Sequence, residues 1–85
     1  MKKILVVNND FDTMNLLKSW LEKKGYEVKF TGNFYEAVRL MKVFAPSLII
    51  IDILQHAVVR SIKSQKEFED IPMLLMTGYT SPPVD

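Results

Sequence analysis

The chain of 85 residues contains no cysteine, and this absence removes several kinds of chemistry at once. Disulfide bonds, thiol nucleophiles and cysteine-ligated zinc are all excluded. Because cysteine usage is the feature that reports on redox compartment, the sequence gives no indication of compartment by that route.

The chain also lacks an excess of one charge and lacks long apolar runs. Lysine and arginine number 11 against 10 acidic residues, and no basic run exceeds a pair such as Lys2-Lys3 or Lys23-Lys24. This pattern predicts no nucleic-acid partner. The apolar run Ile4 to Val7 is too short for a signal-peptide core or a membrane span, so we expect a cytoplasmic protein without a membrane partner.

Glycine is scarce, with only Gly25, Gly32 and Gly78 in the chain. No glycine-rich phosphate loop follows the first apolar run. The sequence therefore speaks against a nucleotide-binding enzyme.

What the chain does contain is the ordinary composition of one small globular domain, with 48% hydrophobic and 25% charged residues. Two runs, Ile4 to Val7 and Leu48 to Ile51, are continuously apolar, as in strands covered on both faces of a parallel sheet. Residues 26–30 instead alternate, which predicts an edge strand. A further apolar strand is expected over 71–77.

Helices are expected between these strands. The first spans about 12–24, with Asp12 as its cap, Trp20 beside its apolar face and Gly25 as a left-handed stop. The second begins at an Asn33–Glu36 capping box and continues through Ala45, until Pro46 forbids it. A third, short helix is expected around 58–66. Strands that alternate with helices predict a parallel sheet with helices on both faces.

The strand at 71–77 has the apolar character of an interior strand, yet no strand follows it. A neighbour is therefore missing on its far side. We expect one domain over 1–80 and a proline-rich tail or linker over 81–85.

Polar residues follow three of the strands, where ligands gather in open parallel sheets. They are Asn8-Asn9-Asp10, Asp52 and Thr77-Gly78. Loops also need polar residues, so this placement alone does not establish a site. His56 has no second ligand nearby in sequence, and we interpret it as a loop residue.

The segments Lys3 to Val7, Leu48 to Leu54 and Ile71 to Tyr79 resemble, in order and spacing, the receiver domain of bacterial response regulators, the CheY-like family. Gly25-Tyr26 and Ala45-Pro46 between them strengthen the resemblance. It implies an α/β, flavodoxin-like parallel sheet of about four strands in order 2-1-3-4 with flanking helices. The final helix-strand-helix of the family has no counterpart in the chain.

The resemblance also implies roles for residues at the strand ends. Asp52 stands at the phospho-acceptor position, and Thr77 stands at the position of the hydroxyl that answers the new phosphate. The family holds Mg²⁺ with two acidic residues after the first strand, but these positions are Asn8 and Asn9 here. We therefore expect at most a weakened Mg²⁺ site of Asp52, Asn8 and Asn9. Asp10 would replace Asn9 only if the loop rearranged.

Three hypotheses follow, none of which makes the chain an enzyme. The leading one is a degenerate receiver, a phosphorylation-independent module for protein interaction or dimerisation in two-component signalling. The second is a receiver that accepts a phosphoryl group from a histidine kinase onto Asp52, and the third is a product of a longer regulator without function of its own. In the family that the chain resembles, the final helix lies beside the first and covers the same face of the sheet, so Trp20 and that face lack a cover here. The strand at 71–77 lacks a neighbour, and we expect a homodimer through one of these two surfaces.

Overall fold

The computed structural model describes residues 2–52 and 56–76 of the chain. Within them, a four-stranded sheet has the strand order β2-β1-β3-β4, and every pair of neighbours is parallel. The expected order 2-1-3-4 is confirmed. The strands are β1 (Lys3–Val7), β2 (Glu27–Thr31), β3 (Leu48–Asp52) and β4 (Met73–Met76).

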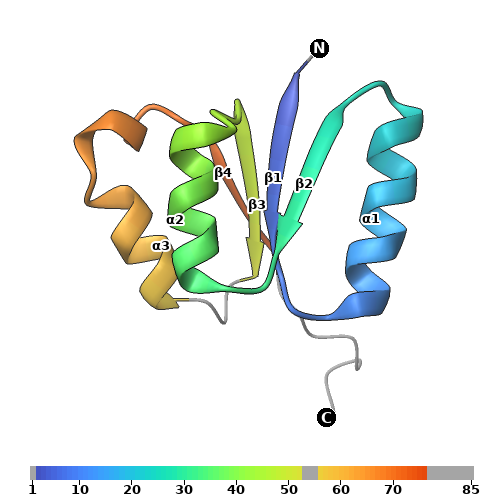
Figure 1. Ribbon diagram of the computed structural model, residues 1–85, viewed down its shortest axis with the longest axis horizontal. Helices are drawn as coiled ribbons and strands as arrows, with labels where there is room; N and C mark the ends of the chain where they lie inside the picture. The colour runs from blue at the N-terminus through green and yellow to red at the C-terminus, as the bar shows by residue number, and fades with distance from the viewer. Residues whose placement is uncertain (1, 53–55, 77–85) are drawn as a thin grey trace, which may run out of the picture.

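Helices lie on both sides of this sheet, so the domain has three layers (Figure 1). Helix α1 (Phe11–Lys23) covers one face by itself, whereas α2 (Phe34–Val43) and α3 (His56–Lys63) lie on the other. A short 3₁₀ helix, η1 (Lys66–Phe68), leads from α3 toward β4. None of the helices in the described residues has the length and apolar character needed to cross a membrane.

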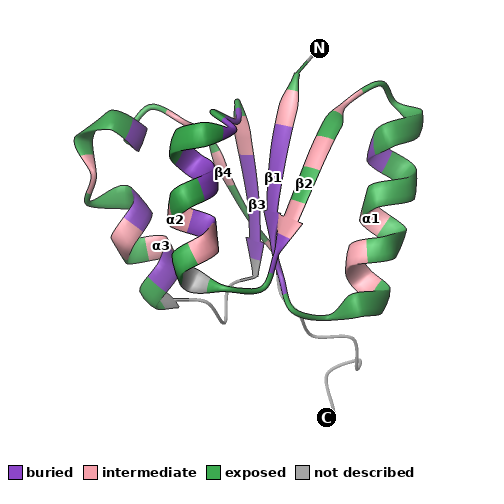
Figure 2. Cartoon of the chain, viewed as in Figure 1, coloured by how far each residue is buried: buried purple, intermediate pink, exposed green. Residues whose placement is uncertain are grey.

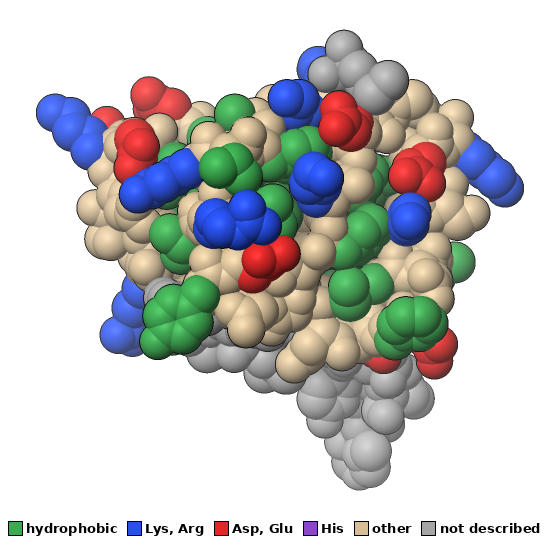
Figure 3. Space-filling view, viewed as in Figure 1, with side chains coloured by type: hydrophobic (Ala, Val, Ile, Leu, Met, Phe, Trp, Pro, Cys, Tyr) green, Lys and Arg blue, Asp and Glu red, His purple; other side chains and the backbone are tan. Residues whose placement is uncertain are grey.

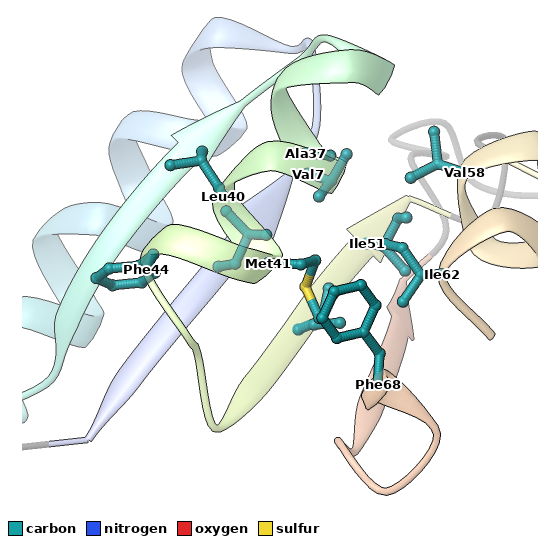
Figure 4. Close-up of a cluster of buried hydrophobic side chains, with 11 residues drawn as sticks. Val7, Ala37, Leu40, Met41, Phe44, Ile51, Val58, Ile62 and Phe68 are labelled. Carbon is teal, nitrogen blue, oxygen red and sulfur yellow. The ribbon is translucent and has the colours of Figure 1, made fainter. Parts of the chain in front are cut away.

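The central strands β1 and β3 are buried on both faces, as their continuous apolar sequences predicted (Figure 2). Successive side chains of a strand point to opposite faces, so each strand contributes to two separate clusters. Leu5, Val7, Ile49 and Ile51 pack with α2, α3 and η1 (Figure 4). On the opposite face, Ile4, Val6 and Ile50 pack with Leu21 of α1.

The two outer strands differ from each other in exposure. Along β2, exposed and partly buried residues alternate, which confirms the predicted edge strand. β4 is apolar, yet Leu74 is 54% exposed and Leu75 is 48% exposed. Among the described residues, β4 pairs only with β3.

The predicted cap of the first helix is wrong by two residues. Asp10, which has an extended backbone, is the N-cap of α1, and its carbonyl oxygen accepts a hydrogen bond from Met14 N–H at 3.0 Å. Asp12 lies in the first turn instead. The expected left-handed stop is confirmed, since Gly25 has φ of 91°.

The second helix starts as predicted, because Asn33 Oδ1 accepts a hydrogen bond from Glu36 N–H at 3.0 Å. It ends earlier than predicted, at Val43. Ala45 is exposed with φ of 52°, and Phe44 occupies the buried position in its place. Ala45, the residue before Pro46, thus lies outside the helix, because proline disfavours helical geometry at the residue that precedes it.

Two further boundaries are corrected. The third helix spans His56–Lys63 rather than 58–66, and η1 follows it because Phe68 turns inward to the core (Figure 4). Strand β4 begins at Met73 rather than at residue 71. Thr77 and the proposed tail at 81–85 lie outside the described residues.

Candidate functional site

The register of the sheet brings the ends of β1 and β3 together at one edge. Val7 pairs with Ile51, so Asn8 and Asp52 stand side by side one residue further on. Asp52 in turn pairs with Met76 of β4, which Thr77 follows in sequence. The backbone therefore places the predicted positions Asn8 and Asp52 together. The Asp52 side chain and Thr77 lie outside the described part of the structure.

Asn8 is completely buried, and its backbone N–H and its side-chain oxygen are both hydrogen-bonded. Its backbone N–H donates to the carbonyl oxygen of Thr31 at 2.9 Å, which ties the end of β1 to the end of β2. Its side-chain Oδ1 accepts a hydrogen bond from the backbone N–H of Asp10 at 2.6 Å. This is a local turn closed by an asparagine side chain, and it fixes the path from β1 into α1.

The other half of the same amide is unsatisfied. Asn8 Nδ2 is buried and has no hydrogen-bond partner among the described residues. A buried donor without a partner costs roughly 1–3 kcal/mol. Turning the amide over would satisfy neither group, because Nδ2 would then face the Asp10 N–H, another donor.

Asn9 is exposed and lies against Gly32 in the turn after β2. A Cβ atom added to Gly32 would lie 2.8 Å from Asn9 Cβ and 3.3 Å from the Asn8 carbonyl oxygen. This close approach of two loops was not predicted from the sequence. The Thr31-Gly32-Asn33 turn carried the only signal for it, because glycine is the residue that permits backbones to come so close.

Asp10 does not take the place of Asn9 at the strand edge. Its carboxylate accepts a hydrogen bond from the Thr13 hydroxyl within the first turn of α1. The described loop therefore uses the one carboxylate after β1 to hold the start of the helix.

These contacts decide whether the described residues fit Mg²⁺, which favours carboxylate and carbonyl oxygens. The only side-chain oxygen of Asn8 already accepts a hydrogen bond, and its remaining group is a donor. One oxygen of the exposed Asp10 carboxylate, Oδ2, accepts the hydrogen bond from the Thr13 hydroxyl. Among the described side chains, which do not include those of Asp52 and His56, no three histidine or acidic residues gather as metal ligands would. The described side chains at this edge thus supply one carboxylate, that of Asp10, and no assembled set of ligands for a divalent cation.

His56 is the first residue of α3 rather than a loop residue. Its side chain lies outside the described part of the structure. The interpretation of this residue as a non-ligand thus stays a prediction.

A second candidate site lies on the face of the sheet that α1 covers only partly. It is an apolar cleft of about 440 Å³. Trp20 forms one wall of the cleft. Its side chain is 57% exposed, as expected for a face of the sheet that lacks a cover. The other lining residues come from the strands, from their N-terminal ends and from α1, and are Lys2, Ile4, Leu21, Tyr26, Ser47, Leu48, Ile50, Pro72 and Leu74.

Comparison with known proteins identifies the family. No protein-family model matches the chain. A chain in the crystal structure of the histidine kinase ThkA in complex with the response regulator protein TrrA superposes with a TM-score of 0.81 at 31% identity, over 100% of this chain and 76% of that one. The protein belongs to the receiver-domain family of response regulators. This receiver domain is also similar to the chemotaxis response regulator CheY4 of Vibrio cholerae, at 25% identity and a TM-score of 0.84, over 96% of this chain and 72% of that one.

Curated relatives agree with this assignment. The receiver domain is 29% identical over 83 residues to the polar-differentiation response regulator DivK of Brucella anthropi, covering 92% of this chain and 68% of DivK. It spans only about a third of the length of other relatives, which are transcriptional regulators. Receiver domains are modules of two-component signalling, and this assignment gives the coarse function of the chain.

Proposed function

We propose that this receiver domain works as a phosphorylation-independent module for protein interaction or dimerisation in two-component signalling. The observation that carries the proposal is the buried Asn8 amide at the end of β1, whose oxygen is already bonded to the Asp10 N–H. An amide at this position supplies no negative charge for a cation beside Asp52, and its one oxygen already accepts a hydrogen bond.

The size of this effect supports the proposal. Removing one unit charge about 4 Å from a divalent ion forfeits several kcal/mol at an effective dielectric constant near 20. Asn8 and Asn9 remove two such charges from the positions that are acidic in the family. Mg²⁺ would accordingly bind weakly at Asp52, Asn8 and Asn9, and phosphoryl transfer that depends on it would be slow.

One observation favours a second candidate function. Asp52 lies at the C-terminal end of β3, beside Asn8, which is the position of a phospho-acceptor in the family. In this alternative, the P–N bond of a phosphohistidine on a histidine kinase breaks and a P–O bond to the Asp52 carboxylate forms. Thr77 would then supply the hydroxyl that answers the phosphate.

Two kinds of partner are part of the proposal. TrrA was crystallised in complex with the histidine kinase ThkA, so a histidine kinase is a candidate partner of this receiver domain as well. A second copy of the chain is the other candidate, through β4 or through the face beside α1. Both surfaces expose large apolar side chains.

The test is the intact mass of the protein after incubation with a small phosphoryl donor such as acetyl phosphate, with and without Mg²⁺. We expect no gain of mass, from protein whose circular dichroism shows it to be folded. A Mg²⁺-dependent gain of one phosphoryl group that disappears in the matched Asp52→Asn variant would contradict the proposal and support the phospho-acceptor.

A further inference from the structure

A stripe of four residues along α1 is exposed although half of it is apolar. Asp12, Leu16 and Trp20 of α1 and its C-cap residue Lys24 follow one another at intervals of four residues, so they form one ridge on the helix surface. All four are exposed, and Leu16 reaches 73%. We refer to these four residues as the α1 stripe.

The stripe borders the apolar cleft, because Trp20 belongs to both. Ile50 and Leu74 form the floor of the cleft on the same face of the sheet. At the C-terminal end of the stripe, Lys24 Nζ lies 5.6 Å from the centroid of the Trp20 ring. The stripe and the cleft together form one apolar surface with a basic end at Lys24 and an acidic end at Asp12.

The α1 stripe is complementary to a second copy of itself that runs in the opposite direction. If a second copy of α1 lies antiparallel, with the crossing point between Leu16 and Trp20, Leu16 faces the partner's Trp20. In the same register, Asp12 faces the partner's Lys24, and the two-fold axis repeats both contacts. Ridges formed by residues four apart pack together in the commonest class of helix crossing, and that class aligns such stripes side by side.

We propose that two copies of this chain associate through the α1 stripe, antiparallel across a two-fold axis, so that each α1 covers the cleft of the other copy. The inference names the partner for the interaction module proposed above and rests on that proposal. Charge complementarity favours a second copy as occupant, because both ends of the stripe find an opposite charge at once. The dimer also buries Trp20, a residue type that dominates interface energetics.

Pairing of β4 edges is the competing arrangement, and the structure distinguishes the two. Leu74 points into the cleft, whereas Leu75 pairs with Ile51 and points to the face of α2 and α3. Edge pairing would extend the sheet but would leave the cleft uncovered. Leu74→Lys should therefore disrupt the stripe dimer, and Leu75→Lys should not.

The experiment is sedimentation velocity over a concentration series of the full chain. We expect a monomer–dimer equilibrium, and Trp20→Ala should raise its dissociation constant by about thirtyfold or more, as for a hot-spot residue. Phe11→Ala is the matched control: Phe11 is 71% exposed on the same helix but lies off the stripe, and this variant should associate as the parent does. Leu74→Lys should dissociate the dimer, and Leu75→Lys should leave it intact.

Charge reversal tests the register itself. Asp12→Lys and Lys24→Asp should each weaken the dimer a few-fold, because each places like charges opposite one another at two symmetric sites. The double variant restores opposite charges and should recover most of the affinity. Trp20 is the only tryptophan in the chain, so its fluorescence emission should shift to the blue as the parent protein dimerises.

A chain that stays monomeric throughout the series overturns the inference. Equal effects of Leu74→Lys and Leu75→Lys, with no effect of Trp20→Ala, also overturn it and indicate edge pairing. The mass measurement described above tests the proposed function separately. A chain that gains a phosphoryl group contradicts the proposed function whatever its oligomeric state. A chain that stays monomeric and gains no phosphoryl group overturns the dimer alone and leaves a different protein as the partner.

Discussion

The side chain of Asn8 accepts a hydrogen bond from the backbone N–H of Asp10, and the two residues together set the path from β1 into α1. Asp10 is then free to serve as the N-cap residue and to bind the Thr13 hydroxyl. The edge of the sheet where the family resemblance implies acidic residues is thus built around a neutral, buried amide. That amide keeps one donor unpaired among the described residues.

Replacing the two asparagines with aspartates should create divalent-cation binding. The Asn8→Asp and Asn9→Asp double variant supplies carboxylate oxygens next to Asp52, whereas the parent supplies a buried donor. In calorimetric titration with Mg²⁺, we expect no saturable heat from the parent and clear binding by the variant. Equal binding by both proteins would show that the amides are adequate ligands and would remove the main support for the proposed function.

Gly32→Ala should destabilise the domain by about 1–3 kcal/mol, the typical cost of overpacking. The added methyl group would lie 2.8 Å from Asn9 Cβ, so the two loops must separate. Urea denaturation monitored by circular dichroism measures this cost. In an Asn9→Gly background the 2.8 Å contact is absent, while the Asn9 Cα at 3.1 Å and the Asn8 carbonyl oxygen at 3.3 Å remain, so part of the cost should vanish. Costs that simply add would argue against the contact with Asn9 Cβ.

Asn33→Ala should lower the free energy of unfolding by about 1 kcal/mol, because it removes the oxygen that accepts from Glu36 N–H at the start of α2. Asn33→Asp keeps an acceptor in that place and should stay within a few tenths of a kcal/mol of the parent. The same urea denaturation gives both values. If alanine and aspartate behaved alike, the cap would contribute nothing.

Phe68→Ala should cost about 3–5 kcal/mol, the range for truncating a buried aromatic residue. Phe68 is only 4% exposed and joins η1 to the core beneath α2 and α3 (Figure 4). In a domain this small, such a loss consumes much of the total stability. Phe11→Ala provides the comparison on an exposed phenylalanine and should change the unfolding midpoint little; similar midpoints for both variants would mean that η1 does not seal the core.

Most of the sheet could be predicted from the sequence because the pattern of apolar residues along a strand reports which of its faces are buried. Continuous apolar runs identified β1 and β3, and alternation at residues 26–30 identified the edge strand β2. Helix ends were harder. Asp10 and Asp12 are both good caps, and the choice between them depends on where the Asn8 side chain closes the turn.

The site was predicted only in part, for a related reason. The register follows from the topology of the sheet, so the sequence was enough to predict that Asn8 and Asp52 lie close together. The burial of Asn8 and the close approach of Gly32 to Asn9 are contacts between loops, which hydrophobic periodicity does not report. The cleft beside Trp20 likewise depends on how much of the sheet a single helix covers. The charge pattern of the surface does not indicate a site either, because basic and acidic side chains are interspersed over the face shown in Figure 3.

The strand order also sets the sequence in which the sheet comes apart. β1 is bonded to neighbours on both sides, whereas β4 is held by β3 alone in the described residues. An opening at β4 breaks one ladder of backbone bonds, while an opening at β1 breaks two, so the amide protons of β4 will exchange with solvent sooner than those of β1. The middle of the sheet is its slow-exchange core, and the domain loosens from the rim inward.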